Sequence, residues 1–243
     1  MENPLYIGLS RQIALRRQLE VVANNIANMN TVGFRADRML FEAAIERAGR
    51  KSTEEVAFTI DRATYTDTQA GPMRQTGNPL DVAIDGDGWL RVDTPEGERF
   101  TRDGRMARSE AGQLVTISGH AVLDDGGLPI DLPAETAAIE ISPEGRISAD
   151  GAPLARIGVV RFADEQSMTR QADGLFASDQ PQQAAGARIV QGMLESANVR
   201  PIVEMSRMME LTRDYQSVTK MIEEGQELLR GAISRLGRPA QGA

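Results

Sequence analysis

Apolar residues recur with a helical period at both ends of the chain. Near the N-terminus one stripe has alternating spacings of four and three, and it consists of Leu15, Leu19, Val22, Ile26 and Met29. Leu5 extends this register backwards, with Gly8 and Gln12 as exceptions. A heptad stripe of this kind predicts an amphipathic helix of the coiled-coil type. We expect it to end at Gly33, because glycine suits a left-handed helix cap.

A longer stripe occupies the C-terminal segment, where only Gly225 breaks the pattern. Its members are Met208, Leu211, Tyr215, Val218, Ile222, Leu229, Ala232 and Leu236. The predicted helix from Pro201 to Leu236 is a rod of about 50 Å, and proline suits its first turn. An isolated helix with a narrow apolar seam is marginal in water. We therefore expect the two ends to pair with each other and then to pack against other copies.

Between these ends the pattern changes to short apolar runs separated by turn signals. The turn signals are Asp85–Gly88, Pro95–Gly97, Asp103-Gly104, Asp124–Gly127, Pro143–Gly145 and Asp150-Gly151. The runs are Leu80–Ile84, Trp89–Val92, Leu114–Ile117, Ala121–Leu123, Ile139–Ile141 and Ile157–Phe162. Many short strands with dense turns predict a β domain of sandwich or barrel type.

The predicted fold class is therefore α+β, with a mainly β domain inserted between two terminal helices of coiled-coil type. The helical region takes residues 1–35 and 199–243, and the β domain takes residues 76–185. Residues 36–75 and 186–198 are predicted connectors. Within the first connector we expect Arg38–Ala48 to continue as helix and Val56–Ile60 to be extended.

Composition and charge narrow the function. The net charge of −8 argues against general nucleic-acid binding and against an anionic membrane surface. The absence of cysteine excludes disulfides and thiolate metal sites. No apolar run approaches the roughly 20 residues that span a bilayer, so we expect no membrane insertion. The start, residues 1–6, lacks the basic and apolar regions of a secretory signal peptide, so we expect no cleaved signal.

Metal and cofactor sites are poorly supported. Counting Asp85 as the first position of a calcium loop puts Glu96 at the twelfth, but Trp89 and Leu90 then stand where an oxygen ligand and a glycine are needed. His120 is the only histidine, so no zinc site can form around it with a second histidine or a cysteine. We predict no catalytic residue, no cofactor and no metal.

The strongest motif is the string Ala23–Phe34, which reads ANNIANMNTVGF. Its four asparagines, Asn24, Asn25, Asn28 and Asn30, are costly in an otherwise apolar helix. They indicate either an unusual helix ending or a buried amide network that fixes the register between neighbouring helices. The string closely resembles the N-terminal signature of the flagellar rod and hook proteins. Met29 departs from that signature, where a smaller residue is usual.

Further stretches resemble the same family in the same order. They are Thr76–Leu90, Phe100–Gly104 with Gly112–Thr116, and Gln191–Val199 followed by Glu204-Met205 and Tyr215-Gln216. Within the family, Leu5–Gln12, Leu15–Leu19, Met208–Leu211 and Tyr215–Val218 resemble a proximal-rod subunit more than a distal-rod subunit. A hook protein fits less well, because the chain leaves little room for extra outer domains.

This resemblance implies a structural protein of the bacterial flagellar basal body that assembles with itself and with other rod proteins. It also implies export by the flagellar type III apparatus. The predicted assembly interface is Leu15, Leu19, Val22, Asn24, Asn25, Ile26, Asn28, Met29, Asn30, Met208, Leu211, Tyr215, Val218, Ile222, Leu229 and Leu236. The alternatives are a distal-rod subunit or, from another class, a protein that binds or cleaves peptidoglycan. A glycosidase would need two paired carboxylates, and no motif selects two of the 35 acidic residues.

Overall fold

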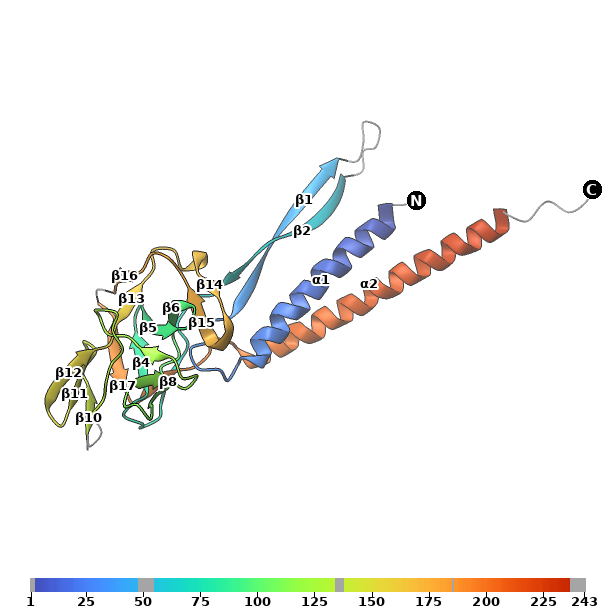
Figure 1. The fold of residues 1–243 in the computed structure, drawn as a ribbon. Helices are drawn as coiled ribbons and strands as arrows, with labels where there is room; N and C mark the ends of the chain where they lie inside the picture. Colours follow the sequence, from blue (N-terminus) through green and yellow to red (C-terminus); the bar gives the residue numbers. More distant parts are fainter. Residues whose placement is uncertain (1–2, 48–54, 134–137, 185, 237–243) are drawn as a thin grey trace, which may run out of the picture. The chain divides into compact units, whose positions relative to one another are not determined.

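The computed structural model describes residues 3–47, 55–133, 138–184 and 186–236 (Figure 1). The chain forms two compact units. One, here called the helical unit, comprises Met1–Ala27, Asp37–Tyr65 and Arg200–Ala243. The other, the β unit, comprises Asn28–Ala36 and Thr66–Val199. The predicted α+β class is confirmed, with two helices and many strands among the described residues.

The helical unit contains α1 (Asn3–Ala27) and α2 (Pro201–Leu236). Figure 1 shows the two helices side by side and running in opposite directions. α1 ends at Ala27, before the predicted stop at Gly33. The reason is local: Thr31 N donates to Asn28 O at 3.0 Å, and this bond closes a turn that replaces the helical pattern. Neither helix, over its described residues, is apolar enough along its length to cross a membrane.

The helical unit also contains a two-stranded sheet of β1 (Asp37–Arg47) and β2 (Glu55–Thr66). The expected helix over Arg38–Ala48 is therefore wrong: the chain is a strand as far as Arg47, and Ala48 lies outside the described residues. Good helix formers fill this segment, but helix propensity is a weak preference that pairing with another strand overrides. The extended conformation expected for Val56–Ile60 is confirmed within β2.

Short strands and tight turns build the β unit. Its strands are β3 (Met73–Gln75), β4 (Val82–Asp85), β5 (Trp89–Thr94), β6 (Gly97–Thr101), β7 (Met106–Arg108), β8 (Leu114–Thr116), β9 (Ala121–Val122), β10 (Ile139–Ile141), β11 (Arg146–Ala149), β12 (Ala152–Arg156), β13 (Val159–Arg161), β14 (Thr169–Arg170), β15 (Leu175–Ala177), β16 (Gln182–Gln183), β17 (Arg188–Gln191) and β18 (Met193–Glu195). Each apolar run predicted from the sequence overlaps one of these strands.

The strands of the β unit lie in several sheets. The largest has the order β14-β15-β6-β5-β9-β8-β7, with β13 joining β5 to β16. A three-stranded sheet has the order β10-β11-β12, and β17 pairs with β4 and β18 with β3. Buried aliphatic side chains from these sheets form one cluster that includes Val82, Leu90, Leu114, Ile147 and Ile189. A second, mainly aromatic cluster consists of Trp89, Phe100, Val160, Phe162 and Phe176.

Predicted turns occur where the backbone needs them. Asp150 and Gly151 join β11 to β12 with φ of 49° and 82°. Positive φ at both central residues is typical of the two-residue hairpin turn that Asp-Gly favours. Gly86, between β4 and β5, has φ of 103°, a conformation that residues with a side chain rarely adopt.

Candidate assembly site

The two terminal helices pack against each other through the predicted stripes. Leu15 and Val22 of α1 and Leu211 and Val218 of α2 are buried in one apolar cluster. The partly buried members of this cluster are Leu19, Ile26, Met208, Tyr215 and Ile222. The whole cluster, buried and partly buried residues together, is here called the seam. Leu229 and Leu236, which were also predicted to be interface residues, belong to α2, but the structure describes only their backbone. The seam therefore joins two segments that are about 190 residues apart in the sequence.

The two exceptions to the N-terminal stripe also lie on the seam. Gly8 is buried, and a Cβ added there would lie 2.9 Å from Ile222 Cγ1. Gln12 Nε2 donates to Tyr215 Oη at 3.3 Å and to Thr219 Oγ1 at 3.1 Å. Because Gly8 has no side chain, the two helices can approach closely at this point. The amide of Gln12 donates hydrogen bonds to two hydroxyl oxygens beside the apolar contact. Gly8 and Gln12 therefore belong to the same contact between α1 and α2 as the apolar stripe.

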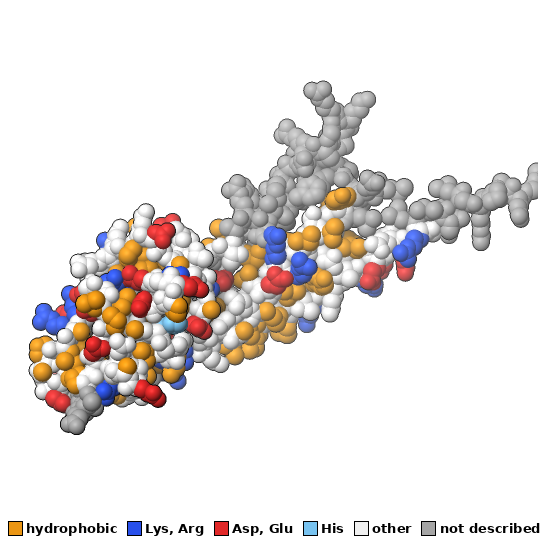
Figure 2. All heavy atoms as spheres, viewed as in Figure 1, with side chains coloured by type: hydrophobic (Ala, Val, Ile, Leu, Met, Phe, Trp, Pro, Cys, Tyr) orange, Lys and Arg blue, Asp and Glu red, His pale blue; other side chains and the backbone are white. Residues whose placement is uncertain are grey.

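Each helix also carries an exposed apolar row that the seam does not use. On α1 the side chains of Tyr6, Leu9 and Ile13 are 69%, 50% and 41% exposed. On α2 the side chains of Ile202, Met205 and Met209 are 81%, 45% and 57% exposed. Orange side chains along the helices are visible at the surface in Figure 2. These rows are not among the predicted interface residues, although their apolar spacings of three and four are the pattern of a helix face.

The asparagine cluster is divided between the two units. Asn25, 1% exposed, lies in the helical unit and bonds to the first residue of β1. Its Nδ2 donates to Asp37 O at 2.9 Å, and its Oδ1 accepts from Asp37 N at 2.9 Å. Asn24 Nδ2 contacts Asp37 Oδ2 at 3.4 Å. Within the chain, the buried amide thus fixes the start of a strand, and its predicted role between helices stays a prediction.

The rest of the cluster lies in the β unit. Asn28 Oδ1 accepts from Thr31 Oγ1 at 3.2 Å, and Asn30 is exposed. Met29 packs against a small apolar cluster that consists of Phe34, Ala36, Ala197 and Val199. The larger side chain at Met29 therefore fills space beside the chain segments that lead to and from the two helices.

Buried charges occur in both units. In the helical unit Arg38 Nη1 lies 3.0 Å from Glu204 Oε1, and the Glu204 side chain is 1% exposed. In the β unit Glu195 bridges two arginines: Oε1 lies 3.0 Å from Arg35 Nη2, and Oε2 lies 3.2 Å from Arg102 Nη1. Burial and then the nearby Arg35 charge lower the pKa of Arg102, and Glu195 opposes this effect. One carboxylate thus neutralises only one of two buried positive charges.

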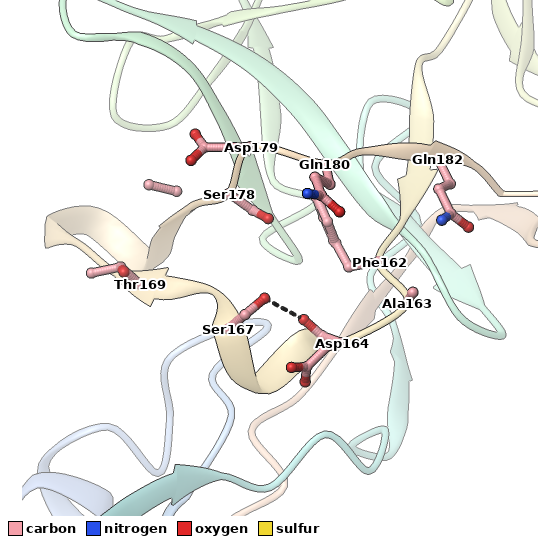
Figure 3. Close-up of a pocket in the computed structure, with 10 residues that line it drawn as sticks. Phe162, Ala163, Asp164, Ser167, Thr169, Ser178, Asp179, Gln180 and Gln182 are labelled. Carbon is pink, nitrogen blue, oxygen red and sulfur yellow. Dashed lines mark hydrogen bonds between the residues drawn. The ribbon is translucent and has the colours of Figure 1, made fainter.

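A polar pocket of about 510 Å³ opens in the β unit (Figure 3). Figure 3 shows hydroxyl, amide and carboxylate groups around it, among them Ser167, Gln180 and the carboxylates of Asp164 and Asp179. Asp164 is engaged in a short turn: its Oδ1 accepts from Gln166 N at 3.0 Å, and its carbonyl accepts from Ser167 Oγ at 2.7 Å. Asp164 therefore has a structural function in this turn, and the pocket lining contains no histidine or cysteine.

Metal-binding groups do not gather elsewhere in the described part of the chain. No cluster of three or more histidine, cysteine, aspartate or glutamate side chains suited to a metal ion is found there. His120 lines a shallow pocket with Glu96 and Asp173, without forming such a cluster.

Three parts of the chain match known protein families. Residues 5–35 match the family described as flagella basal body rod protein. Residues 83–149 match the flagellar hook protein FlgE/F/G D1 domain, and residues 190–235 match the flagellar basal body rod FlgEFG protein C-terminal family. The matched ends contain most of α1 and most of α2, and the central match lies in the β unit.

Individual relatives cover nearly the full length. The chain is 39% identical to the flagellar basal-body rod protein FlgF of Caulobacter vibrioides, over 98% of this chain and 99% of that protein. It is 36% identical to FlgF of Mesorhizobium japonicum, again over 98% and 99%. It is 30% identical to the flagellar basal-body rod protein FlgG of Bacillus subtilis, over 96% and 99%.

Proposed function

Because this chain belongs to the flagellar basal-body rod protein family, we propose that it is a structural subunit of the bacterial flagellar basal-body rod. It polymerises through its terminal helices and helps to form the drive shaft between motor and hook. The higher identity to the FlgF relatives than to the FlgG relative favours a proximal-rod subunit over a distal-rod one.

The observation that carries this proposal is the pair of exposed apolar rows on α1 and α2. The seam already satisfies one face of each helix, so these rows need another partner. Large exposed apolar surfaces on a soluble protein mark interaction sites. Neighbouring subunits with helices of the same kind present matching rows, and we propose that they pack as coiled coils do. We therefore propose Tyr6, Leu9, Ile13, Ile202, Met205 and Met209 as contacts between subunits, whereas the seam joins α1 to α2 within each subunit.

The remaining predictions extend this function. The partners are other copies and related rod proteins, and the chain reaches the periplasm-spanning rod through the flagellar type III export apparatus. The terminal helices are the polymerising region, and the β domain is the inserted part. The absence of cysteine supports this route, because an unfolded chain then passes without a disulfide to break.

Charges in the exposed rows test the proposal. Leu9→Glu and Met209→Glu place solvated carboxylates on the free subunit, so its melting temperature should change little. In the polymer the same groups would be buried without a partner, which costs several kcal/mol each. We expect both variants to be lost from isolated basal bodies and to abolish motility. Glu20→Lys and Glu210→Lys, on exposed polar positions of the same helices, are the matched controls.

Two outcomes separate this function from its rivals. Normal recovery of both row variants in basal bodies would contradict assembly through these helix faces. A peptidoglycan-cleaving protein would instead lyse purified sacculi, with lysis lost in Asp164→Asn or Asp179→Asn, the carboxylates of the polar pocket. We expect no lysis by the unmodified protein.

A further inference from the structure

Three segments of the β unit connect it covalently to the helical unit. Residues 28–36 follow α1 and precede β1, the second segment starts at Thr66, the last residue of β2, and the segment ending at Val199 precedes α2. Backbone hydrogen bonds join these segments within the β unit. Gly33 N donates to Glu195 O at 2.8 Å, and Asp67 N donates to Ala36 O at 2.7 Å.

The side chain of Asn198 bonds to two of these segments from the third. Its Oδ1 accepts from Ala36 N at 2.7 Å. Its Nδ2 donates to Asp67 O at 2.8 Å and to Gln69 O at 2.9 Å. One amide thus ties the segment that leads to α2 to the segments on both sides of the β1–β2 hairpin. An amide has one acceptor and two donor hydrogens, so both hydrogens and the oxygen of Asn198 are used.

Glu195 makes a second connection among the same segments. Besides its contact with Arg35, Oε1 accepts from Gly71 N at 2.9 Å. Arg35 also donates to the carbonyl of Gln69. Through Oε2 and Arg102 the carboxylate is attached to the body of the β unit, because Arg102 Nη2 donates to Gly86 O at 2.9 Å. Glu195 therefore belongs to the third segment, contacts the other two, and is attached through Arg102 to the rest of the β unit.

Two glycines show how closely the segments approach. A Cβ at Gly71 would lie 1.9 Å from Ser196 O, which is a backbone atom. A Cβ at Gly33 would lie 2.5 Å from the carbonyl carbon of Arg102, and Gly33 has φ of 69°. Backbone atoms cannot yield as a flexible side chain can, so the approach depends on residues without a Cβ.

We infer that Asn198 and Glu195 are positioning residues that form a clamp. The clamp fixes the points at which the chain leaves the β unit for α1, for the β1–β2 hairpin and for α2. The apolar cluster of Phe34, Ala36, Ala197 and Val199 holds the same segments together, but apolar contacts have little directionality. Hydrogen bonds to named backbone atoms fix direction as well as distance. This inference rests on the proposed function, because exit points matter when every subunit must present its helices identically to its neighbours.

The functional consequence is mechanical. In a rod subunit, the covalent path between the β unit and the helices runs through these segments. If each segment were tethered separately, the exit points would vary from one subunit to the next, and a polymer would tolerate such variation poorly. The clamp removes this variation without contributing to the apolar core of the β unit.

Two substitutions of Asn198 separate the bonds of the clamp. Asn198→Ala removes all three, whereas Asn198→Asp keeps an acceptor for Ala36 N and places an oxygen against the carbonyls of Asp67 and Gln69. The test is amide hydrogen exchange on the purified full chain, together with recovery of the subunit in basal bodies. We expect exchange at Ala36 to rise about tenfold in Asn198→Ala, which corresponds to the loss of one hydrogen bond, and to rise much less in Asn198→Asp.

The core of the β unit should be unaffected while assembly suffers. We expect the amide of Leu114, in β8, to keep its protection in both variants, and we expect both to be recovered poorly in basal bodies. Asn78→Ala is the matched control, because Asn78 Nδ2 bonds only locally, to Asp81 Oδ1 at 2.9 Å, and it should assemble normally.

Two results would overturn the inference. One is normal assembly of Asn198→Ala despite faster exchange at Ala36. The other is loss of Leu114 protection in proportion to loss of assembly, which would make Asn198 a stability residue only. Failure of the proposed function is seen separately, as normal assembly of Leu9→Glu and Met209→Glu, whose side chains lie in the other unit.

Discussion

Gly8 of α1 lies directly against the side chain of Ile222 of α2, so that a methyl group at Gly8 would come within 2.9 Å of Ile222 Cγ1. This contact brings the first turns of α1 beside the second half of α2. Gly8 interrupts the apolar stripe in the sequence, but in the structure it is the position where the two helices approach closely. The rest of the seam continues through Leu15 and Val22.

Enlarging Gly8 should separate the helices. We expect Gly8→Leu to destabilise the helical pairing by about 1–3 kcal/mol through overpacking, although leucine is the better helix former. The measurement is thermal melting followed by the helical circular dichroism signal. Gly231→Leu is the control, since a Cβ there meets nothing within 4 Å. Restoration of the melting temperature by the double variant Gly8→Leu/Ile222→Ala would identify the contact, and equal melting of Gly8→Leu and the unmodified protein would contradict it.

A charge introduced in the buried seam should lower the melting temperature of the free subunit, whereas a charge in the exposed rows should not. Val218 is 4% exposed and packs in the seam, so Val218→Asp should lower the melting temperature of the free subunit as well as its assembly. Ile222→Asp should have a smaller effect of the same kind, because Ile222 is only partly buried. Glu223→Lys, which is exposed on the same helix, should be mild. Unchanged melting of Val218→Asp would show that the free chain does not form the seam.

Asn25 should protect the start of β1. In Asn25→Ala the Asp37 amide loses its acceptor at 2.9 Å, and the Asp37 carbonyl loses its donor. A buried group left without its partner costs about 1–3 kcal/mol. Hydrogen exchange at Asp37 should therefore become much faster, whereas Asn30→Ala, at an exposed position, should leave it unchanged. Slow exchange at Asp37 in Asn25→Ala would mean that this pairing is not formed in solution.

Removing the charge of Glu195 should destabilise the β unit strongly. Glu195→Gln removes the carboxylate that contacts both buried arginines, Arg35 and Arg102, and breaking a buried ion pair in this way costs about 3–5 kcal/mol. The single tryptophan, Trp89, is buried in the β unit, so its fluorescence during urea denaturation reports the loss. Glu204→Gln is the comparison, because its partner Arg38 is 28% exposed and lies in the helical unit. The urea midpoint reported by Trp89 fluorescence should therefore not change in this variant.

Truncations should locate the boundary of the β unit. Residues 28–36 pack within that unit through Phe34 and Ala36, so removal of residues 1–27 should leave the Trp89 transition near its original midpoint. Removal of residues 1–36 should lower the midpoint, because it also deletes Arg35, the partner of Glu195. Assembly should be lost in both cases. Equal midpoints for the two truncated proteins would show that residues 28–36 add nothing to the β unit.

The sequence by itself determined the elements that depend on local period and local backbone chemistry. The seam of α1 and α2 follows from apolar spacings of three and four, and a helix turns such spacings into one face whatever its partner is. The hairpin at Asp150-Gly151 follows from the backbone conformations that these residues permit. Strands such as β5 and β8 follow from short apolar runs between turns.

The tertiary structure alone decided the features that depend on which distant segments meet. Arg38–Arg47 has residues that favour a helix, yet it is a strand because β2 supplies its hydrogen-bonding partner. Asn198 and Glu195 stand in a readable motif, but their contacts with residues 35–36 and 67–71 join positions more than 120 residues apart. The exposed rows were legible as spacings, but only the packing of α1 on α2 shows which face is left uncovered. Period is a property of one segment, whereas burial and hydrogen bonding between segments exist only once the chain has folded.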